Sequence, residues 1–455
     1  MLPESLIKSL LSVPEFDETA FTEIHQSGEQ VTSVRLNPFK FNILDSTFKK
    51  ESSVPWSSNG YYLPERPSFT LDPCFHAGAY YVQEASSMFL EQALKQTVDL
   101  SKPLKILDLC AAPGGKSTLI QSLISKESLL VSNEVIKSRV NVLAENCTKW
   151  GAANIIVTNN DPLHFQRLEN YFDVIVVDAP CSGSGLFRKD PDAINEWSEN
   201  NVQLCSQRQQ RILADVMPAL KDGGVLIYST CSYSKEEDES IADWMMEELK
   251  VGSWKLKVEK SWGIVETISE KHSAFGYRFY PDKVRGEGFF ICTFRKNNSG
   301  NNNTALPNPK NKKYQVSAKE AAILQPYLQN PDDYCFIKQQ DEFIALPVFI
   351  EHELPFLQAA LYIRKAGIKM GSLIREDLIP DHELALCTEI NPDITFIAVD
   401  EPTALNYLRR EEIKLETPQK GWALLQFNKL NLGWVKILPN RINNYYPKDW
   451  RILNK

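Results

Sequence analysis

The sequence has no apolar run long enough to span a bilayer and no basic flank of a secretory signal at its start. Runs such as Val174–Val177 fall far short of the roughly 20 residues that a spanning helix needs. The opening MLPESLIKSLLSVPEF carries acidic rather than basic flanking residues. The nine cysteines form no CxxC pair and no Cys/His cluster, which argues against a disulfide framework and a zinc site. We therefore expect a cytoplasmic protein with reduced thiols, without membrane association and without a bound metal.

Basic residues are also in deficit. Lys and Arg number 50 against 58 Asp and Glu, a net charge of −8, which argues against a nonspecific nucleic-acid coat. The deficit is confined to residues 1–296, because residues 297–455 hold 19 basic and 19 acidic residues. The last 27 residues reverse the sign, with six basic residues against Asp449 alone. The total charge therefore leaves room for RNA binding by local patches.

That basic tail also contains Trp434, Tyr445, Tyr446 and Trp450. Basic and aromatic residues together are what contact with a nucleic-acid backbone and stacking on bases require. A solvated edge of a small β-domain would have the same composition. Both interpretations remain open at this point.

The length of 455 residues predicts about three domains. Between about 100 and 296 the pattern alternates strands with helices, which predicts an α/β fold with a mostly parallel sheet covered on both faces. The expected strands are LKILDL, SLLVSNEV, NIIVTNND, YFDVIVVDAP and GGVLIYSTCS, with GEGFFICTFRK as a late edge strand. Ligands of such sheets bind at the carboxyl ends of the strands, where the polar motifs of this sequence lie.

The first expected strand ends in Asp108 and runs into a glycine-rich turn, CAAPGGKST. The turn is not GxGxxG, which weakens a dinucleotide fold. It nearly matches the phosphate-binding GxxxxGK[ST] loop, but the first glycine of that pattern would fall at Cys110, which disfavours a P-loop NTPase. The next two strands end in Glu134 and Asp161. Acids at three successive strand ends favour a cationic adenosyl cofactor, S-adenosyl-L-methionine, although Glu134 and Asp161 could each simply cap a helix.

Two thiols follow the fourth and fifth expected strands, Cys181 in DAPCSGSG and Cys231 in STCS. The ends of parallel strands open into one crevice, so we expect these thiols to converge beside the cofactor. Carbon 5 of a pyrimidine is a weak nucleophile until a thiolate adds at carbon 6. A carboxyl group such as Asp178 would stabilise the charge that then develops on the ring. The base must be flipped out or single-stranded to reach such a pocket.

The motifs LDLCAAPGGKST, NEV, NND, DAPCSGSG, YSTCS and GFFICTFRK, in this order, resemble the Sun (Fmu, nucleolar Nop2-type) family of RNA cytosine-C5 methyltransferases. The segments SVRLNPFK and AGAYYVQEASSM resemble the lead-in of that family, so the likeness covers about residues 33–296. The resemblance implies that Cys231 is the nucleophile and that Cys181 assists product release. It also implies a cofactor site formed by Cys110, Ala111, Ala112, Pro113, Gly114, Gly115, Lys116, Glu134, Asp161 and Asp178.

The C-terminal part resembles bacterial RsmF-type enzymes, which modify small-subunit ribosomal RNA. GWALLQFNKLNLGWVKILPNRINNYYPKDWRIL is similar to their PUA-like RNA-binding tail, and LYIRKAGIKMGSLIREDLIP fits their intermediate module. We expect an N-terminal RNA-binding lead-in (1–95), a Rossmann-like methyltransferase domain (96–296), a linker (297–313), an intermediate module (314–385) and a PUA-like domain (386–455).

The resemblance implies an enzyme that methylates carbon 5 of a cytosine in RNA, and we expect this enzyme to be a monomer. Small-subunit (16S) ribosomal RNA is the preferred substrate and transfer RNA the second choice. A ribosome-assembly factor that binds RNA without catalysis is an alternative of a different class. The residues expected to contact RNA are Arg35, Lys40, Arg188, Lys189, Lys436, Arg441 and Lys448.

Overall fold

A ten-stranded mixed sheet forms the centre of the computed structural model, which describes residues 2–40, 51–298, 306–308 and 316–453. The strand order is β11-β12-β13-β9-β8-β5-β6-β7-β16, with β10 paired to β13. Five neighbouring strands run parallel: β5 (Lys105–Asp108), β6 (Leu129–Asn133), β7 (Ile155–Thr158), β8 (Phe172–Asp178) and β9 (Leu220–Thr230). These strands confirm the predicted α/β core.

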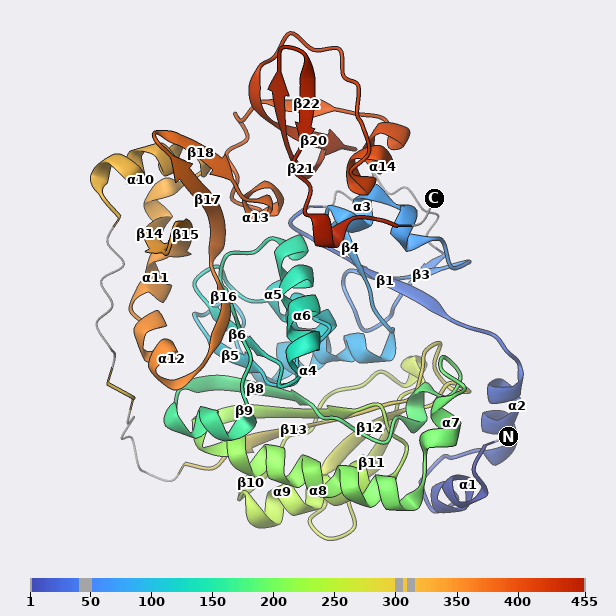
Figure 1. Cartoon of the computed structure of the whole chain (residues 1–455). Helices are drawn as coiled ribbons and strands as arrows, with labels where there is room; N and C mark the ends of the chain where they lie inside the picture. The colour runs from blue at the N-terminus through green and yellow to red at the C-terminus, as the bar shows by residue number, and fades with distance from the viewer. Residues whose placement is uncertain (1, 41–50, 299–305, 309–315, 454–455) are drawn as a thin grey trace.

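The parallel strands are apolar along their whole length because both of their faces are covered. In β8, Val174 and Val176 pack into one core cluster, while Ile175 and Val177 pack into another. The covering helices are α4 (Leu90–Thr97), α5 (Gly115–Gln121) and α6 (Lys137–Trp150) on one side, and α8 (Glu199–Val216) and α9 (Glu239–Glu248) on the other (Figure 1). Short helix α7 (Ala193–Glu196) precedes α8.

Antiparallel strands extend the sheet on both sides. Beyond β9 lie β13 (Phe289–Lys296), β12 (Phe275–Phe279) and β11 (Val265–Ile268), and β10 (Val251–Ser253) also pairs with β13. The prediction of β13 as an edge strand was wrong. Its residues from Phe289 to Phe294 are buried, as expected of a strand with neighbours on both sides.

The opposite side of the sheet receives a strand from the C-terminal third of the chain. Strand β16 (Ile363–Ala366) pairs antiparallel with β7. The other elements around β16 are β14 (Tyr334–Gln339), β15 (Glu342–Pro347), β17 (Ile368–Ile374), β18 (Asp377–Pro380), α10 (Ala318–Leu324), α11 (Val348–Glu351), α12 (Leu354–Ala360) and α13 (His382–Leu386). The expected intermediate module thus contributes a strand to the central sheet. The expected linker, 297–313, lies mostly outside the described residues.

Part of the N-terminal region packs against the C-terminal part of the chain. The N-terminal part contains helices α1 (Glu4–Leu10), α2 (Glu18–Gln26) and α3 (Pro73–His76) and a sheet of β1 (Thr32–Leu36), β2 (Ser52–Ser53), β3 (Gly60–Leu63) and β4 (Tyr80–Val82). The C-terminal part contains α14 (Glu401–Arg409), β19 (Phe396–Ala398), β20 (Gly421–Phe427), β21 (Leu430–Leu438) and β22 (Arg441–Asn444). Val34 and Tyr80 of the first share a core cluster with Tyr407 and Leu425 of the second. The N-terminal sheet and α3 lie beside the C-terminal part in Figure 1, whereas α1 and α2 lie apart from it and pack with Phe187, Tyr233 and Tyr280.

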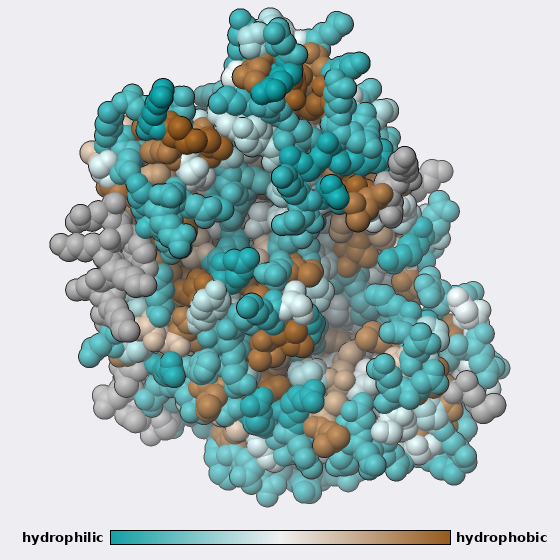
Figure 2. All heavy atoms as spheres, viewed as in Figure 1, coloured by the Kyte–Doolittle hydropathy of each residue, from teal (hydrophilic) through white to brown (hydrophobic). Residues whose placement is uncertain are grey.

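Hydrophilic residues cover most of the molecular face seen in Figure 2, and the apolar residues on it form separate patches. Among the described residues, none of the helices combines the length and the apolar character that crossing a bilayer requires.

Candidate active site

The cofactor loop, residues 109–114, turns sharply between β5 and α5. Gly114 stands directly before the helix with φ of +116°, a left-handed conformation that glycine adopts readily. The N–H of Ala111 donates to the carbonyl of Asn133 at 2.8 Å, and the N–H of Leu109 donates to Val176 at 2.9 Å. The loop is therefore held against the ends of β6 and β8.

A pocket of about 170 Å³ opens beside this loop. One wall is formed by Cys110, Ala111, Ala112, Pro113, Gly115, Lys116 and Asp178, and the other by Tyr81, Val82, Gln83, Glu84 and Ser87. A Cβ atom at Gly115 would lie 3.3 Å from Cε1 of Tyr81, so the glycine preserves the width of the pocket. The second wall is formed by residues in and just after β4, a segment that the sequence identified only as part of the lead-in.

Asp108 lies fully buried beneath the loop. Its Oδ2 accepts a hydrogen bond from the Ser117 hydroxyl at 2.6 Å, while Oδ1 has no hydrogen-bond partner among the described residues. Burial raises the pKa of Asp108 to about 7, against the opposing effect of the Ser117 hydroxyl. Asp108 is not among the residues that line the pocket, whereas Glu84 and Asp178 are, and these two acids fit a cofactor that carries positive charge.

Glu134 and Asp161 lie where the sequence placed them, after β6 and β7. The Glu134 carboxylate accepts from the N–H of Ile136 at 2.8 Å and lies 3.6 Å from Arg139. Asp161 accepts from the N–H of Leu163 at 3.1 Å and so caps the short helix η4 (Pro162–Arg167). Asp161 therefore makes the contact that the capping interpretation expects, whereas the following helix α6 has no side-chain cap from Glu134. Their contact with a cofactor remains a prediction.

Lys116 and Asp178 form an ion pair at the mouth of the pocket. Nζ of Lys116 lies 2.8 Å from Oδ2 of Asp178, and the Ser229 hydroxyl donates to Oδ1 at 2.8 Å. Burial opposes the charge on Lys116, but the attraction of Asp178, with smaller contributions from Asp108 and Cys231, outweighs it and raises the pKa. This ammonium group is held by a carboxylate, whereas a P-loop would need it for phosphate.

The structure brings the two strand-end thiols together. Sγ of Cys181 and Sγ of Cys231 lie 3.0 Å apart, and both residues are partly exposed. The hydrogen bond with Cys231, together with burial, raises the pKa of Cys181 well above its ordinary value. Two thiolates at this distance would repel each other, so the pair can hold one negative charge at a time.

Three family models match this chain: 16S rRNA methyltransferase RsmB/F over residues 95–295, the N-terminal domain of 16S rRNA methyltransferase RsmF over residues 2–85, and the methyltransferase RsmF PUA domain over residues 395–452. The ribosomal RNA small subunit methyltransferase F of Aeromonas salmonicida is 30% identical, over 92% of this chain and 90% of its own. The chain belongs to this methyltransferase family. The recognition and the fold class predicted from the sequence are thereby confirmed.

Other relatives of this RsmB/F-family methyltransferase support the same family assignment. The enzyme of the same name from Shewanella loihica is 28% identical over 92% of this chain and 88% of its own. A methyltransferase homolog from Pyrococcus horikoshii has a solved structure that is 28% identical, with a TM-score of 0.51 over 65% of this chain and all of its own. NSun6 from the same organism, solved with SFG, has a TM-score of 0.54 at 18% identity, over 65% of this chain and 99% of its own, and shares the fold.

The RsmB/F-family assignment makes this chain an S-adenosylmethionine-dependent methyltransferase, as the sequence predicted. The cofactor loop, the pocket wall from β4 and Asp178 are the groups that would hold the cofactor. Within the described ranges, we find no cluster of three or more His, Cys, Asp or Glu side chains suited to a metal ion.

Three of the expected RNA-contacting residues of this family member point inward, which corrects the prediction. The guanidinium of Arg35 is buried and donates to Gln83, Thr118 and Gly115. Lys40 donates to the carbonyls of Ala77 and Lys149 at 3.0 and 2.6 Å, and burial lowers its pKa to about 7. The side chain of Arg188 is 4% exposed, donates to Glu29 and Gly286, and lies 3.8 Å from Glu287.

The remaining expected RNA contacts lie at the surface. Lys189, Arg441 and Lys448 are exposed, and Lys436 lies half-buried over the ring of Trp422 at 5.0 Å. Among the aromatic residues of the tail, Trp434 and Tyr446 are buried in the core. Tyr445 is exposed and contacts Trp422. Of the four aromatic side chains, Tyr445 is therefore the most accessible for stacking on a base.

Three residues that were not identified from the sequence support the site through contacts with distant parts of the chain. Gln83 joins Arg35 to the pocket wall, and Arg139 donates to the Ala112 carbonyl of the cofactor loop at 2.6 Å. Glu237 lies beneath the two thiols and is described below. No local motif marks these residues, because their partners are distant in the sequence.

Proposed function

We propose that this methyltransferase transfers a methyl group to carbon 5 of a cytosine in small-subunit ribosomal RNA, with Cys231 as the nucleophile. The observation that carries the proposal is the pair of thiols 3.0 Å apart, beside the Lys116–Asp178 ion pair. A methyltransferase that modified a more nucleophilic atom, such as an amine or hydroxyl, would need neither thiol. Carbon 5 of a pyrimidine does need one.

Cys231 acts first by adding its sulfur to carbon 6 of the cytosine. The 5,6 double bond is consumed, and carbon 5 becomes nucleophilic enough to take a methyl group. S-adenosylmethionine supplies that methyl group as an electrophile. The ammonium group of Lys116 interacts electrostatically with the Cys231 side chain. Asp178, held by Lys116 and Ser229, is available beside the ring to stabilise charge on its nitrogen 3 side.

Cys181 assists product release, the step that follows methyl transfer. A base removes the proton from carbon 5, the electron pair re-forms the 5,6 double bond, and the bond between carbon 6 and the Cys231 sulfur breaks. The raised pKa of Cys181 keeps this thiol neutral while Cys231 carries the charge of the attacking thiolate. The assignment of attack to Cys231 and release to Cys181 follows the family resemblance, because the geometry of the pair is nearly symmetrical.

Ribosomal RNA is the proposed substrate for two reasons. The relatives from Aeromonas salmonicida and Shewanella loihica carry names that specify small-subunit ribosomal RNA. The C-terminal part matches a PUA domain and exposes Arg441 and Lys448. No observation favours transfer RNA or a purely structural role. We propose that the enzyme acts as a monomer in the cytoplasm, where ribosomal subunits are assembled.

The test is methylation of ribosomal RNA in vitro, followed by mass spectrometry of the nucleosides and bisulfite sequencing. Small-subunit RNA from a deletion strain serves as substrate, either naked or in the particle. We expect 5-methylcytosine at a single cytosine that the deletion strain leaves unmethylated. Methylation at a nitrogen or at a ribose oxygen, with no 5-methylcytosine, would refute the proposal.

A further inference from the structure

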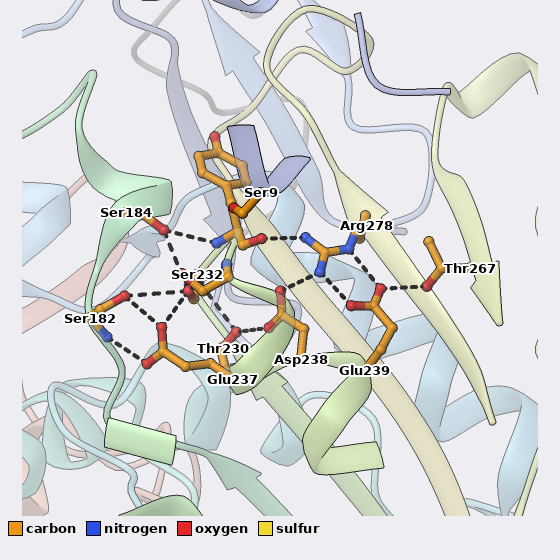
Figure 3. A network of polar contacts seen from close by, with 12 residues as sticks. Ser9, Ser182, Ser184, Thr230, Ser232, Glu237, Asp238, Glu239, Thr267 and Arg278 are labelled. Atoms are coloured by element: carbon orange, nitrogen blue, oxygen red, sulfur yellow. Dashed lines mark hydrogen bonds and ion pairs between the residues drawn. The ribbon is translucent and has the colours of Figure 1, made fainter. Parts of the chain in front are cut away.

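A buried carboxylate lies beneath the two thiol loops, which we define as residues 180–185 after β8 and 231–234 after β9. It belongs to Glu237, in the short helix η7 (Lys235–Glu237). Its Oε1 accepts the N–H of Ser182 at 2.8 Å, and its Oε2 accepts the hydroxyls of Ser182 and Ser232 at 2.5 and 2.6 Å (Figure 3). Each thiol loop therefore donates to this carboxylate from the residue that follows its cysteine.

The location of Glu237 is unfavourable for a carboxylate. Burial raises its pKa, and hydrogen bonds from Ser182, Ser232 and Gln209 offset that effect only in part. An apolar side chain of similar size would fill the space without desolvating a charge. Packing alone therefore does not account for an acid at this position, whereas the need to join two loops does.

The element that carries Glu237 is itself firmly anchored. Asp238 and Glu239, the next two residues, both pair with the buried guanidinium of Arg278 on β12, and Nη2 of Arg278 lies 3.1 Å from Asp238 (Figure 3). The Asp238 carboxylate also accepts from the hydroxyl of Thr230, directly before Cys231. The carboxylate of Glu237 is thus presented from a rigid support.

The thiol loops also contact each other directly. The N–H of Gly185 donates to the carbonyl of Cys231 at 2.9 Å, and the N–H of Tyr233 donates to the Ser184 hydroxyl at 2.9 Å. The first of these bonds reaches the backbone of Cys231 itself, and the hydroxyls of Ser182 and Ser232 also lie 3.4 Å apart. Glu237 accepts from both Ser182 and Ser232, each of which directly follows a cysteine.

We propose that Glu237 is a positioning residue that holds the sulfurs of Cys181 and Cys231 at reacting distance. It contacts neither sulfur, and it acts through Ser182 and Ser232. The inference rests on the proposed function in one respect, the use of both thiols in one reaction. A displacement of about 1 Å at reacting groups is enough to slow a reaction by about a hundredfold.

The distance between the sulfurs can be probed without RNA or cofactor. Diamide, an azo oxidant, takes one hydrogen from each thiol and is reduced to the hydrazine, while a Cys181–Cys231 disulfide forms. We expect Glu237→Gln to slow formation of this disulfide by about tenfold, because the amide replaces an acceptor of two hydroxyls with a donor. The matched control is Glu236→Gln, the same change one residue earlier, which should react at the wild-type rate. Mass spectrometry of the linked peptides gives the rates.

Single-turnover methyl transfer provides the second readout. Glu237→Gln should lose about a hundredfold in rate, with an unchanged dissociation constant for S-adenosylmethionine. Glu237→Asp, which keeps the charge, should recover part of the loss. A folded Glu237→Gln protein that forms the disulfide at the wild-type rate would overturn the proposal.

Two further variants apply if Glu237→Gln does not fold. Ser182→Ala and Ser232→Ala each remove one hydroxyl donor to Glu237, and each should slow disulfide formation. Wild-type rates in both would also overturn the proposal. If the wild-type enzyme makes no 5-methylcytosine while these variants still differ in disulfide rate, the proposed function fails and the positioning role of Glu237 stands.

Discussion

The strand-end crevice and the expected RNA-contacting cations differ in what determines the position of their side chains. In the crevice, Lys116, Asp178, Cys181 and Cys231 lie together as expected. Among the cations, Arg35, Lys40 and Arg188 turn inward and bond to the protein itself. The difference has a physical origin. The topology of a parallel sheet fixes where its strand ends meet, but the exposure of a long cationic side chain depends on partners anywhere in the fold.

Among the variants that test this comparison, Cys231→Ala should have the largest effect, a loss of methyl transfer. Loss of the nucleophile should reduce methyl transfer about a thousandfold or more, because carbon 5 is then not activated. Transfer of a tritiated methyl group to small-subunit RNA measures it. Cys335→Ala, at a thiol outside the crevice, is the matched control and should retain full activity. Full turnover by Cys231→Ala would show that the sequence motif misassigned the nucleophile.

Cys181→Ala should be slow for a different reason. The covalent adduct between Cys231 and RNA should accumulate, since the thiol that assists release is missing, and turnover should fall about a hundredfold. A protein–RNA band that survives denaturing electrophoresis detects the adduct. The double variant Cys181→Ala/Cys231→Ala should show no such band. An active wild-type enzyme whose Cys181→Ala variant forms no adduct would remove Cys181 from the release step.

Arg35→Met tests the inward-facing cations. Removal of the guanidinium should lower the free energy of unfolding by about 2–4 kcal/mol, because buried acceptors on Gln83, Thr118 and Gly115 are left without their donor. Lys189→Met, at an exposed cation, should change stability by less than about 0.5 kcal/mol. Urea unfolding gives both values. Equal stabilities would mean that Arg35 is accessible after all and restore it as a candidate for RNA contact.

The smallest effects are expected from the exposed cations of the C-terminal part. Arg441→Ala or Lys448→Ala should weaken RNA binding a few-fold and reduce the slope of log affinity against log salt by about 0.7–0.9 for each phosphate that is no longer neutralised. Filter binding at several salt concentrations measures the slope. Lys319→Ala, at an exposed residue in α10, provides the comparison. An unchanged slope in both C-terminal variants would favour the solvated-edge interpretation of the tail.

Most of the core could be predicted from the sequence because its signals are local. Runs such as YFDVIVVDAP identify buried strands, and Gly114 and Gly115 identify the turn of the cofactor loop. Contacts between segments that are distant in the sequence left no local signal of this kind. The neighbours of β13, the strand β16 that joins β7 from about 200 residues away, and the hydrogen bonds of Glu237 depend on segments that the sequence does not place side by side.

Strand β16 has a consequence for how this enzyme is made. The parallel part of the sheet is complete once Thr230 has been synthesised, but β7 keeps an unpaired edge until residues 363–366 emerge, and Asn160 also waits for its two hydrogen bonds with the backbone of Tyr362. An exposed strand edge is a site for wrong pairing with other chains. The late arrival of β16 therefore makes translation of the C-terminal third a step in building the catalytic sheet. A polypeptide cut after residue 296 would have the proposed catalytic residues and an open edge at β7, on the far side of β5 and β6 from the two thiols.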